Sequence, residues 1–94
     1  MPLELIPFDA AETLDTPEAQ AAFLADVLST GDAGFIAHAM GTLARAQNMT
    51  RVAQDAGVSR AALYKSLTED GDPKLSTVLG VLSALGLRLS AQAA

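Results

Sequence analysis

The fold is indicated by one stretch of the chain, Met49–Leu67, with the sequence MTRVAQDAGVSRAALYKSL. Thr50 is expected to cap a short helix that reaches Ala56, and Ser59 to cap a second helix. A hydroxyl side chain suits both positions because it accepts a hydrogen bond from a free amide at a helix start. Gly57 lies between the two helices, where a sharp turn with positive φ favours glycine.

The spacing of small and apolar residues in this stretch is that of a helix-turn-helix. Ala53 is small where two helices would cross closely, Gly57 follows four residues later, and Leu63 lies six residues beyond. Val58 is expected to fill the turn, and Leu63 and Leu67 to face the core. A generic pair of short helices can match by chance, but caps at both helix starts and a basic outer face favour the motif.

The second helix has an outer face suited to the major groove of DNA. Arg60, near its start, can donate a fork of hydrogen bonds to guanine, while Tyr64 and Lys65 lie one turn further on, near a base edge or a phosphate. Alanines such as Ala61 keep the helix slim. The residues better placed for the phosphate backbone are Thr50, Arg51, Ser59 and Lys74. The alternative is a solvated face with one exposed tyrosine.

A single unit of this kind makes few phosphate contacts, so its affinity at cellular salt is low. Helix-turn-helix proteins place two recognition helices about one DNA turn apart by forming dimers. A homodimer on a palindromic operator is therefore expected, with the last helix and Leu87–Ser90 as the candidate contacts.

Helical signals continue on both sides of this stretch. Thr16-Pro17-Glu18 marks a helix start, and Ser29-Thr30-Gly31 ends that helix. Asp32 caps a second helix that ends at Gln47-Asn48, and a last helix is expected from about Leu75 to Leu85. The apolar residues predicted to face the core are Phe23, Leu24, Val27 and Leu28, then Phe35, Ile36, Ala39, Met40 and Leu43, and finally Leu75, Val78, Leu79, Leu82 and Leu85.

The predicted fold is all-α, with five helices in a single domain over residues 1–94. Residues 1–15 form an N-terminal arm, and residues 49–67 the helix-turn-helix. Gly86 suits the end of the last helix. The alternation in Leu87-Arg88-Leu89-Ser90 fits either a short C-terminal strand or a helix extension.

Charge is distributed unevenly along the chain. Seven acids and no Lys or Arg precede Arg45, whereas six bases and four acids follow from that residue onward. The first part therefore carries −7 and the second +2. A DNA duplex repels an acidic body, but two parts of opposite sign indicate two binding tasks. The alternative is that acids simply favour solvated helix starts.

Composition narrows the class of protein. The 94 residues suffice for one small core, and the absence of cysteine excludes disulfides and thiolate metal sites. No apolar run approaches the roughly 20 residues that cross a membrane. The opening MPLELIPFDAAE has no basic region ahead of an apolar stretch, so no signal peptide is expected. A soluble cytoplasmic protein is predicted.

The residues do not indicate an enzyme. The single histidine, His38, falls within an amphipathic helix and is expected at its surface or half-buried. Asp70 and Asp72 flank Gly71 in a turn, where they are expected to cap the last helix, since the other ligands of a calcium loop are absent. There is no glycine-rich phosphate loop and no pairing of a nucleophile with a base. Neither a metal nor a cofactor is predicted.

Short pieces spread along the chain resemble a known family. The most specific are Leu63-Tyr64-Lys65-Ser66-Leu67 and Gly71-Asp72-Pro73. The others are Phe8-Asp9, Leu14, Gly31-Asp32, Ala44-Arg45-Ala46, Asn48-Met49-Thr50, Val52-Ala53, Gly57-Val58-Ser59-Arg60 and Ala84-Leu85-Gly86-Leu87. Together they resemble the addiction-module antidote proteins, the small Xre/HigA-like antitoxins of bacterial type II toxin–antitoxin pairs. The resemblance implies a lambda-repressor-like helical domain, binding to a RelE/ParE-like toxin, and repression of the protein's own operon.

The resemblance also suggests a function for the acidic part of the chain. RelE-like toxins are typically basic because they work on RNA, and an acidic segment would neutralise such a surface and speed association. The arm and first helix are therefore expected to contact the toxin, with Phe8 and Leu14 as apolar anchors and Asp9, Glu12 and Asp15 among the pairing charges. The alternative is an arm packed on its own domain.

The predicted function is thus that of an antitoxin with three partners: operator DNA, a RelE/ParE-like toxin and a second copy of itself. The alternative is a stand-alone helix-turn-helix regulator without a toxin. A third hypothesis is a helix-turn-helix that has lost DNA binding and serves only protein interaction. A neighbouring gene for a small basic protein would distinguish the first two hypotheses.

Overall fold

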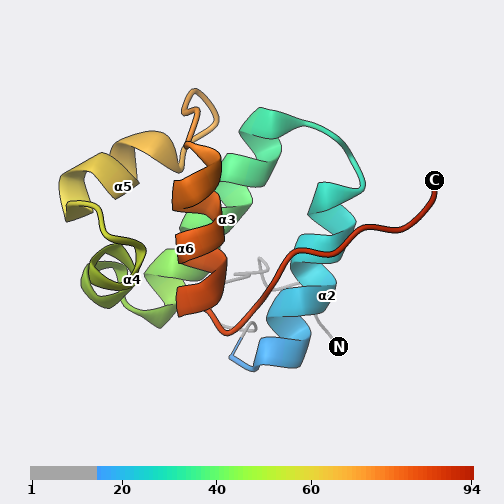
Figure 1. Ribbon diagram of the computed structural model, residues 1–94, viewed down its shortest axis with the longest axis horizontal. Coiled ribbons are helices and arrows are strands. Elements are labelled where there is room, and N and C mark those ends of the chain that lie inside the picture. The colour runs from blue at the N-terminus through green and yellow to red at the C-terminus, as the bar shows by residue number, and fades with distance from the viewer. Residues whose placement is uncertain (1–14) are drawn as a thin grey trace, which may run out of the picture.

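The computed structural model describes residues 15–94, which fold entirely into helices and connecting loops (Figure 1). Five helices follow one another in this range: α2 (Pro17–Leu28), α3 (Ala33–Gln47), α4 (Met49–Ala56), α5 (Arg60–Ser66) and α6 (Leu75–Ala84). The all-α prediction with five helices is confirmed. Except for Asp15, the predicted N-terminal arm lies outside the described residues.

Residues 87–94 are neither a strand nor a helix extension. Helix α6 ends at Ala84, and Gly86 follows with a positive φ of 78°, as expected for the residue after a helix end. The chain then leaves α6 and passes across α2 as an irregular extended segment (Figure 1).

Side-chain caps set most of the helix starts. The Thr16 hydroxyl accepts from the Ala19 amide at 3.1 Å, and the Asp32 carboxylate accepts from the Phe35 amide at 3.0 Å. Both starts were predicted. The predicted cap at Thr50 is wrong, because the side-chain oxygen of Asn48 accepts from the Arg51 amide at 3.1 Å.

Asn48 takes this role because α3 and α4 are joined through a single residue, which ends one helix and begins the next. Thr50 therefore lies within the first turn of α4. The prediction that Asp70 or Asp72 caps the last helix is also wrong. Lys74 precedes α6, and among the described residues no side chain caps that helix start.

One apolar core joins all five helices. Its fully or nearly buried members are Leu24, Val27, Ala39, Met40, Leu43, Ala44, Met49, Val52, Ala53, Leu63, Leu67, Val81, Leu82 and Leu85. These residues are aliphatic or methionine, as expected for a chain poor in aromatic residues. Several predicted core residues lie elsewhere. Leu75 is 66% exposed, Leu79 47%, Phe35 44% and Leu28 38%.

The error in α6 has a geometric cause. This helix packs closely against α4, and its most buried side chains are Val81 and Leu82, whereas Leu75 and Leu79 are exposed. Gly80 allows the close approach, because a Cβ placed there would lie 3.0 Å from the Ala56 Cα atom. Periodicity predicted the helix correctly, but its leucines and valines cover a sector wider than the part that the core buries, and Leu75 and Leu79 lie at the exposed edge of that sector.

Candidate nucleic-acid interface

The turn between α4 and α5 is closed by backbone hydrogen bonds. Gly57 adopts φ 76° and ψ 27°, the left-handed conformation predicted for it. The Gly57 amide donates to the Gln54 carbonyl at 3.2 Å, and the Val58 amide to the Ala53 carbonyl at 3.1 Å. The Ser59 hydroxyl accepts from the Ala62 amide at 3.0 Å and caps α5. The chain thus turns within three residues and sets α5 at a defined angle to α4.

Helix α5 is held by one face. Leu63 is fully buried within the helix, and Leu67, which follows its last residue, is 1% exposed. The remaining face points away from the core, and the eight residues predicted for DNA contact are all exposed: Thr50, Arg51, Ser59, Arg60, Ala61, Tyr64, Lys65 and Lys74. These residues are thus accessible to a ligand on and around α5.

Arg60 and Tyr64 interact with each other on the outer face of α5. The Arg60 guanidinium lies 5.4 Å from the centre of the Tyr64 ring, and its Nη2 donates to the phenol oxygen at 3.5 Å. The residues are one helical turn apart, which allows this contact. A guanidinium held against a ring is restricted in its rotamers while its outer N–H groups remain available.

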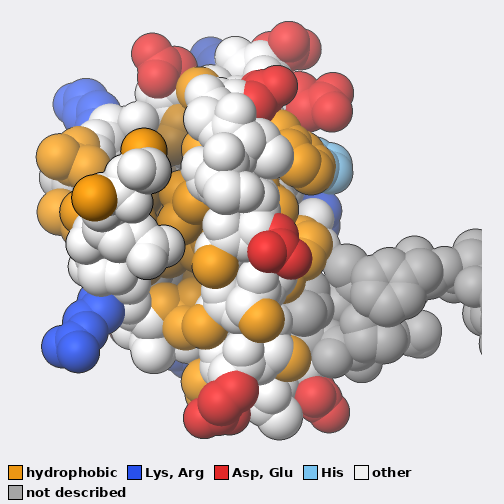
Figure 2. Space-filling view, turned by 90° about the vertical axis from the view of Figure 1, so that its right-hand side faces the viewer, with side chains coloured by type: hydrophobic (Ala, Val, Ile, Leu, Met, Phe, Trp, Pro, Cys, Tyr) orange, Lys and Arg blue, Asp and Glu red, His pale blue; other side chains and the backbone are white. Residues whose placement is uncertain are grey.

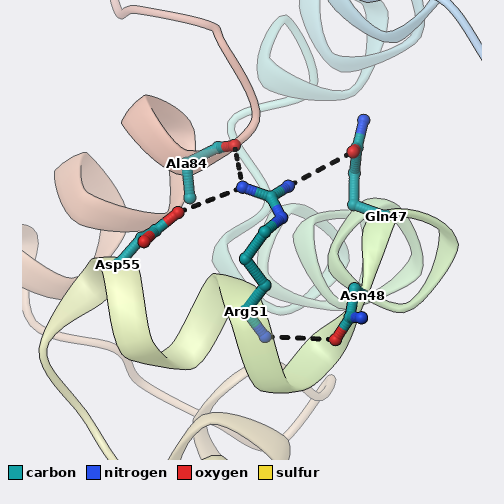
Figure 3. Close-up of polar contacts among 5 residues, drawn as sticks. All are labelled: Gln47, Asn48, Arg51, Asp55 and Ala84. Carbon is teal, nitrogen blue, oxygen red and sulfur yellow. Dashed lines mark hydrogen bonds and ion pairs between the residues drawn. The ribbon is translucent and has the colours of Figure 1, made fainter.

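Arg51 has a different environment from the other bases (Figure 3). Its Nη1 donates to Asp55 Oδ2 at 3.0 Å and to the Ala84 carbonyl at 3.3 Å, and its Nη2 donates to Gln47 Oε1 at 3.3 Å. The guanidinium therefore joins α3, α4 and the end of α6. A phosphate contact by Arg51, as predicted from the sequence, would compete with these three acceptors.

The start of α6 borders the exposed face of α5. A hollow of about 290 Å³ is lined by Val58, Ala62 and Ser66 on one side and by Asp72, Pro73, Lys74 and Thr77 on the other. Lys74, for which a phosphate contact was predicted, therefore lies beside α5. The loop and α5 form one continuous exposed surface.

A second surface lies along α2. A groove of about 360 Å³ runs between α2 and the C-terminal segment, with Leu24 and Leu28 on one side and Leu87 and Leu89 on the other. Figure 2 shows hydrophobic side chains gathered beside α2 and carboxylates spread over the same face. The exposed acids of this region are Asp15, Glu18 and Asp26.

Sequence reasoning missed this groove, because it assigned the whole apolar stripe of α2 to the core. The exposure of Leu28 and the extended course of residues 87–92 create the groove together. Of the residues predicted for toxin contact, Asp15 is exposed directly before α2. Phe8, Asp9, Glu12 and Leu14 lie outside the described residues.

Other kinds of site find no support in the described part of the chain. His38 is exposed on α3, as predicted. Within residues 15–94, no group of three or more His, Cys, Asp or Glu side chains is arranged to hold a metal ion. None of the helices in the same range is long and apolar enough to cross a membrane.

The fold and its exposed basic helix define a small all-helical protein with a helix-turn-helix. Residues 4–93 match the family model described as "Probable addiction module antidote protein". The chain belongs to this family of addiction-module antidote proteins. It is 40% identical over 89 residues to a protein of Haemophilus influenzae named "Uncharacterized protein", and the match covers 95% of this chain and 92% of that relative. No solved structure matches the chain significantly.

Proposed function

We propose that this protein is an Xre/HigA-like antitoxin that neutralises a RelE/ParE-like toxin and represses its own operon through α4 and α5. Membership of the antidote family over nearly the whole chain carries the first half of the proposal. The exposed Arg60, Tyr64 and Lys65 on a helix that packs only by its inner face support the second half. The protein acts by binding and not by catalysis.

For DNA, the proposed arrangement places α5 in the major groove. Arg60 donates to guanine acceptors, held in place by the Tyr64 ring, while Lys65 reaches a base edge or a phosphate. The side chains of Thr50, Ser59 and Lys74 surround this centre and contact the phosphate backbone. The small side chain of Ala61 allows α5 to lie close to the base pairs at the floor of the groove. A homodimer presents two such units to a palindromic operator.

DNA binding is tested with a fragment of the promoter upstream of the gene, by fluorescence anisotropy. The double variant Arg60→Ala/Lys65→Ala removes two positive charges from α5, and we expect its affinity to fall by roughly tenfold or more, since a specific base contact is worth about 1–3 kcal/mol. The double variant Arg45→Ala/Arg88→Ala removes the same charge from other elements and serves as the matched control. Equal loss in both variants would show a nonspecific charge effect, and no loss in either would refute the DNA-binding assignment.

For the toxin, the proposal places a basic partner against the arm and α2. Asp15, Glu18 and Asp26 supply carboxylates there, and Asp9 and Glu12 extend the acidic stretch along the sequence. The groove between α2 and residues 87–92 supplies apolar surface beside these charges. Opposite charges speed the encounter of two proteins, and the apolar contact slows their separation.

Toxin binding is tested by co-expressing the product of the adjacent gene and measuring association rates at several salt concentrations. The variant Asp9→Asn/Glu12→Gln/Asp15→Asn should associate several-fold more slowly at low salt, with the difference shrinking as salt increases. The control Glu69→Gln/Asp70→Asn/Asp72→Asn neutralises three acids that lie far along the chain, in the loop after α5. Failure to capture any partner from the adjacent gene would favour the alternative of a stand-alone regulator.

A further inference from the structure

The outer face of α6 contains leucines and serines but no charge. Its exposed residues are Leu75, Ser76, Leu79 and Ser83, which fall within one sector of the helix. Figure 1 shows α6 at the front of the molecule, with no other helix in front of it. In the sequence, no charged residue occurs from Leu75 through Leu87.

Packing within the chain does not account for these leucines. The core-facing side of α6 and the residue after its end already supply Val81, Leu82 and Leu85, all 3% exposed or less. Leu75 and Leu79 have 66% and 47% of their surface in solvent, although polar residues would serve as well there. Two exposed leucines one turn apart, beside small serines, form a flat apolar strip against which another helix can lie closely.

Charge identifies the partner that fits this strip. In a two-fold symmetric contact, the same patch meets itself, so a charge near the axis meets an equal charge. The outer face of α5 carries Arg60 and Lys65, and α2 carries Glu18 and Asp26, so both would repel their own copies. The strip on α6 carries no charge, so two copies of it can meet without such repulsion. A basic toxin, by contrast, would gain no charge pairing from it.

The position of the strip also suits a dimer on DNA. The start of α6 borders α5 through the hollow between Ala62 and Thr77. If two α6 helices pair antiparallel, the two-fold axis that relates them is perpendicular to both helices. The two α5 helices then lie at the same height along this axis, on the same side of the dimer. Two recognition helices must be presented in this way to contact successive major grooves on one face of a duplex.

We propose that Leu75, Ser76, Leu79 and Ser83 of α6 form the surface through which two copies of this chain associate. The biological purpose of this dimer rests on the proposed operator binding, but the contact itself does not. The residue nearest the middle of the strip is Leu79, so its side chain meets the partner's strip close to the two-fold axis.

The test is the mass of the full-length protein in solution, without DNA or toxin, by sedimentation from low to high micromolar concentration. The wild type is expected to change from one chain, 9.7 kDa, to two as concentration increases. Leu79→Glu places like charges at the contact and should remain a single chain throughout, with an unchanged helical spectrum because nearly half of the Leu79 surface already lies in solvent. Phe35→Glu makes the same kind of change at an exposed aromatic on α3 and should still dimerise.

Three results would overturn the proposal: a wild type that stays monomeric, a Leu79→Glu variant that still dimerises, or a Phe35→Glu variant that dissociates equally. Arg60→Ala separates this inference from the proposed function. If the operator assignment fails, Arg60→Ala leaves DNA binding unchanged, and the mass measurements still decide whether α6 is the dimer surface. If the α6 assignment alone fails, Arg60→Ala weakens DNA binding while Leu79→Glu remains dimeric.

Discussion

Helices α5 and α6 are neighbours that each bury one face and expose the other, yet their exposed faces differ in kind. The outer face of α5 carries Arg60, Tyr64 and Lys65, whereas that of α6 carries leucines and serines. The buried sides are alike, because both consist of aliphatic residues in the same core. Folding therefore constrains the inner faces, and the outer faces are free to differ in the partners that they select. The positive charge on the outer face of α5 favours binding to a polyanion, whereas the uncharged outer face of α6 favours contact with a second copy of the same chain.

The largest expected effect comes from breaking the shared core at α5. Leu63→Ala removes a fully buried side chain, and we expect it to lower the free energy of unfolding by about 3 kcal/mol and the melting temperature by roughly 10–20 °C. Thermal unfolding followed by circular dichroism measures this change. Leu75→Ala makes the same substitution on the exposed strip of α6 and, at a concentration low enough to keep the chain monomeric, should change stability by less than about 0.5 kcal/mol. Similar losses in both variants would contradict the assigned burial.

DNA binding through α5 and dimer formation through α6 should differ in their dependence on salt concentration. Raising monovalent salt from about 50 to 200 mM should weaken operator binding on the order of a hundredfold, because bound counterions are released when phosphates are neutralised. Over the same range, the dimer constant should hardly change, because the α6 strip has no charges. Anisotropy and sedimentation at matched salt concentrations measure the two responses. A dimer constant that follows salt as steeply as DNA binding would place the dimer contact on a charged surface instead.

The turn that sets the angle of α5 should be sensitive to a single methyl group. Gly57→Ala should destabilise the protein by about 1 kcal/mol, because a side chain at φ 76° strains the backbone. No atom beyond its two chain neighbours lies within 4 Å of the added Cβ, so the cost is conformational and not steric. Gly57→Asn should cost less, since asparagine tolerates this conformation better. Urea unfolding ranks the three proteins, and an alanine variant as stable as the wild type would be inconsistent with this turn.

The smallest effect should come from Tyr64. Tyr64→Leu removes the ring that restricts Arg60 and should weaken operator binding two- to fivefold, since an exposed cation–π contact is worth about 0.5–1 kcal/mol. Tyr64→Phe keeps the ring and loses only a long hydrogen bond, so its affinity should stay within about twofold of the wild type. If both variants lose affinity equally, the phenol oxygen contacts DNA itself, and the ring is not what positions Arg60.

The sequence was most informative where local chemistry decides the structure. Caps at Thr16, Asp32 and Ser59, and the positive φ at Gly57, each depend on a few adjacent residues, and all were predicted correctly. Thr50 was mistaken for a cap because Asn48, two residues earlier, competes for the same role. Local patterns alone do not show that one residue joins α3 directly to α4.

Orientation about a helix axis was less predictable. In α6, leucine and valine form a sector wider than the core can cover, so long-range packing, including the contact of Gly80 with Ala56 on α4, decides which part of the sector is buried. The groove along α2 was missed for a related reason, since it depends on where residues 87–92 return across the chain. Both features are long-range, and periodicity carries no information about them.

The crossing of Gly80 over Ala56 also has a consequence for how the molecule opens. Helices α4 and α6 pack against each other while α5 lies on the chain between them, so their contact closes a loop that contains the recognition helix. Closing such a loop lowers the entropy of the chain, and the packing of α4 against α6 offsets this cost. Amide hydrogens of α4 and α6 should therefore exchange with solvent only in the globally unfolded protein, whereas α5, with seven residues and one buried leucine, can open locally. The helix that we propose to bind DNA is thus the one that could adjust to it at least cost to the rest of the fold.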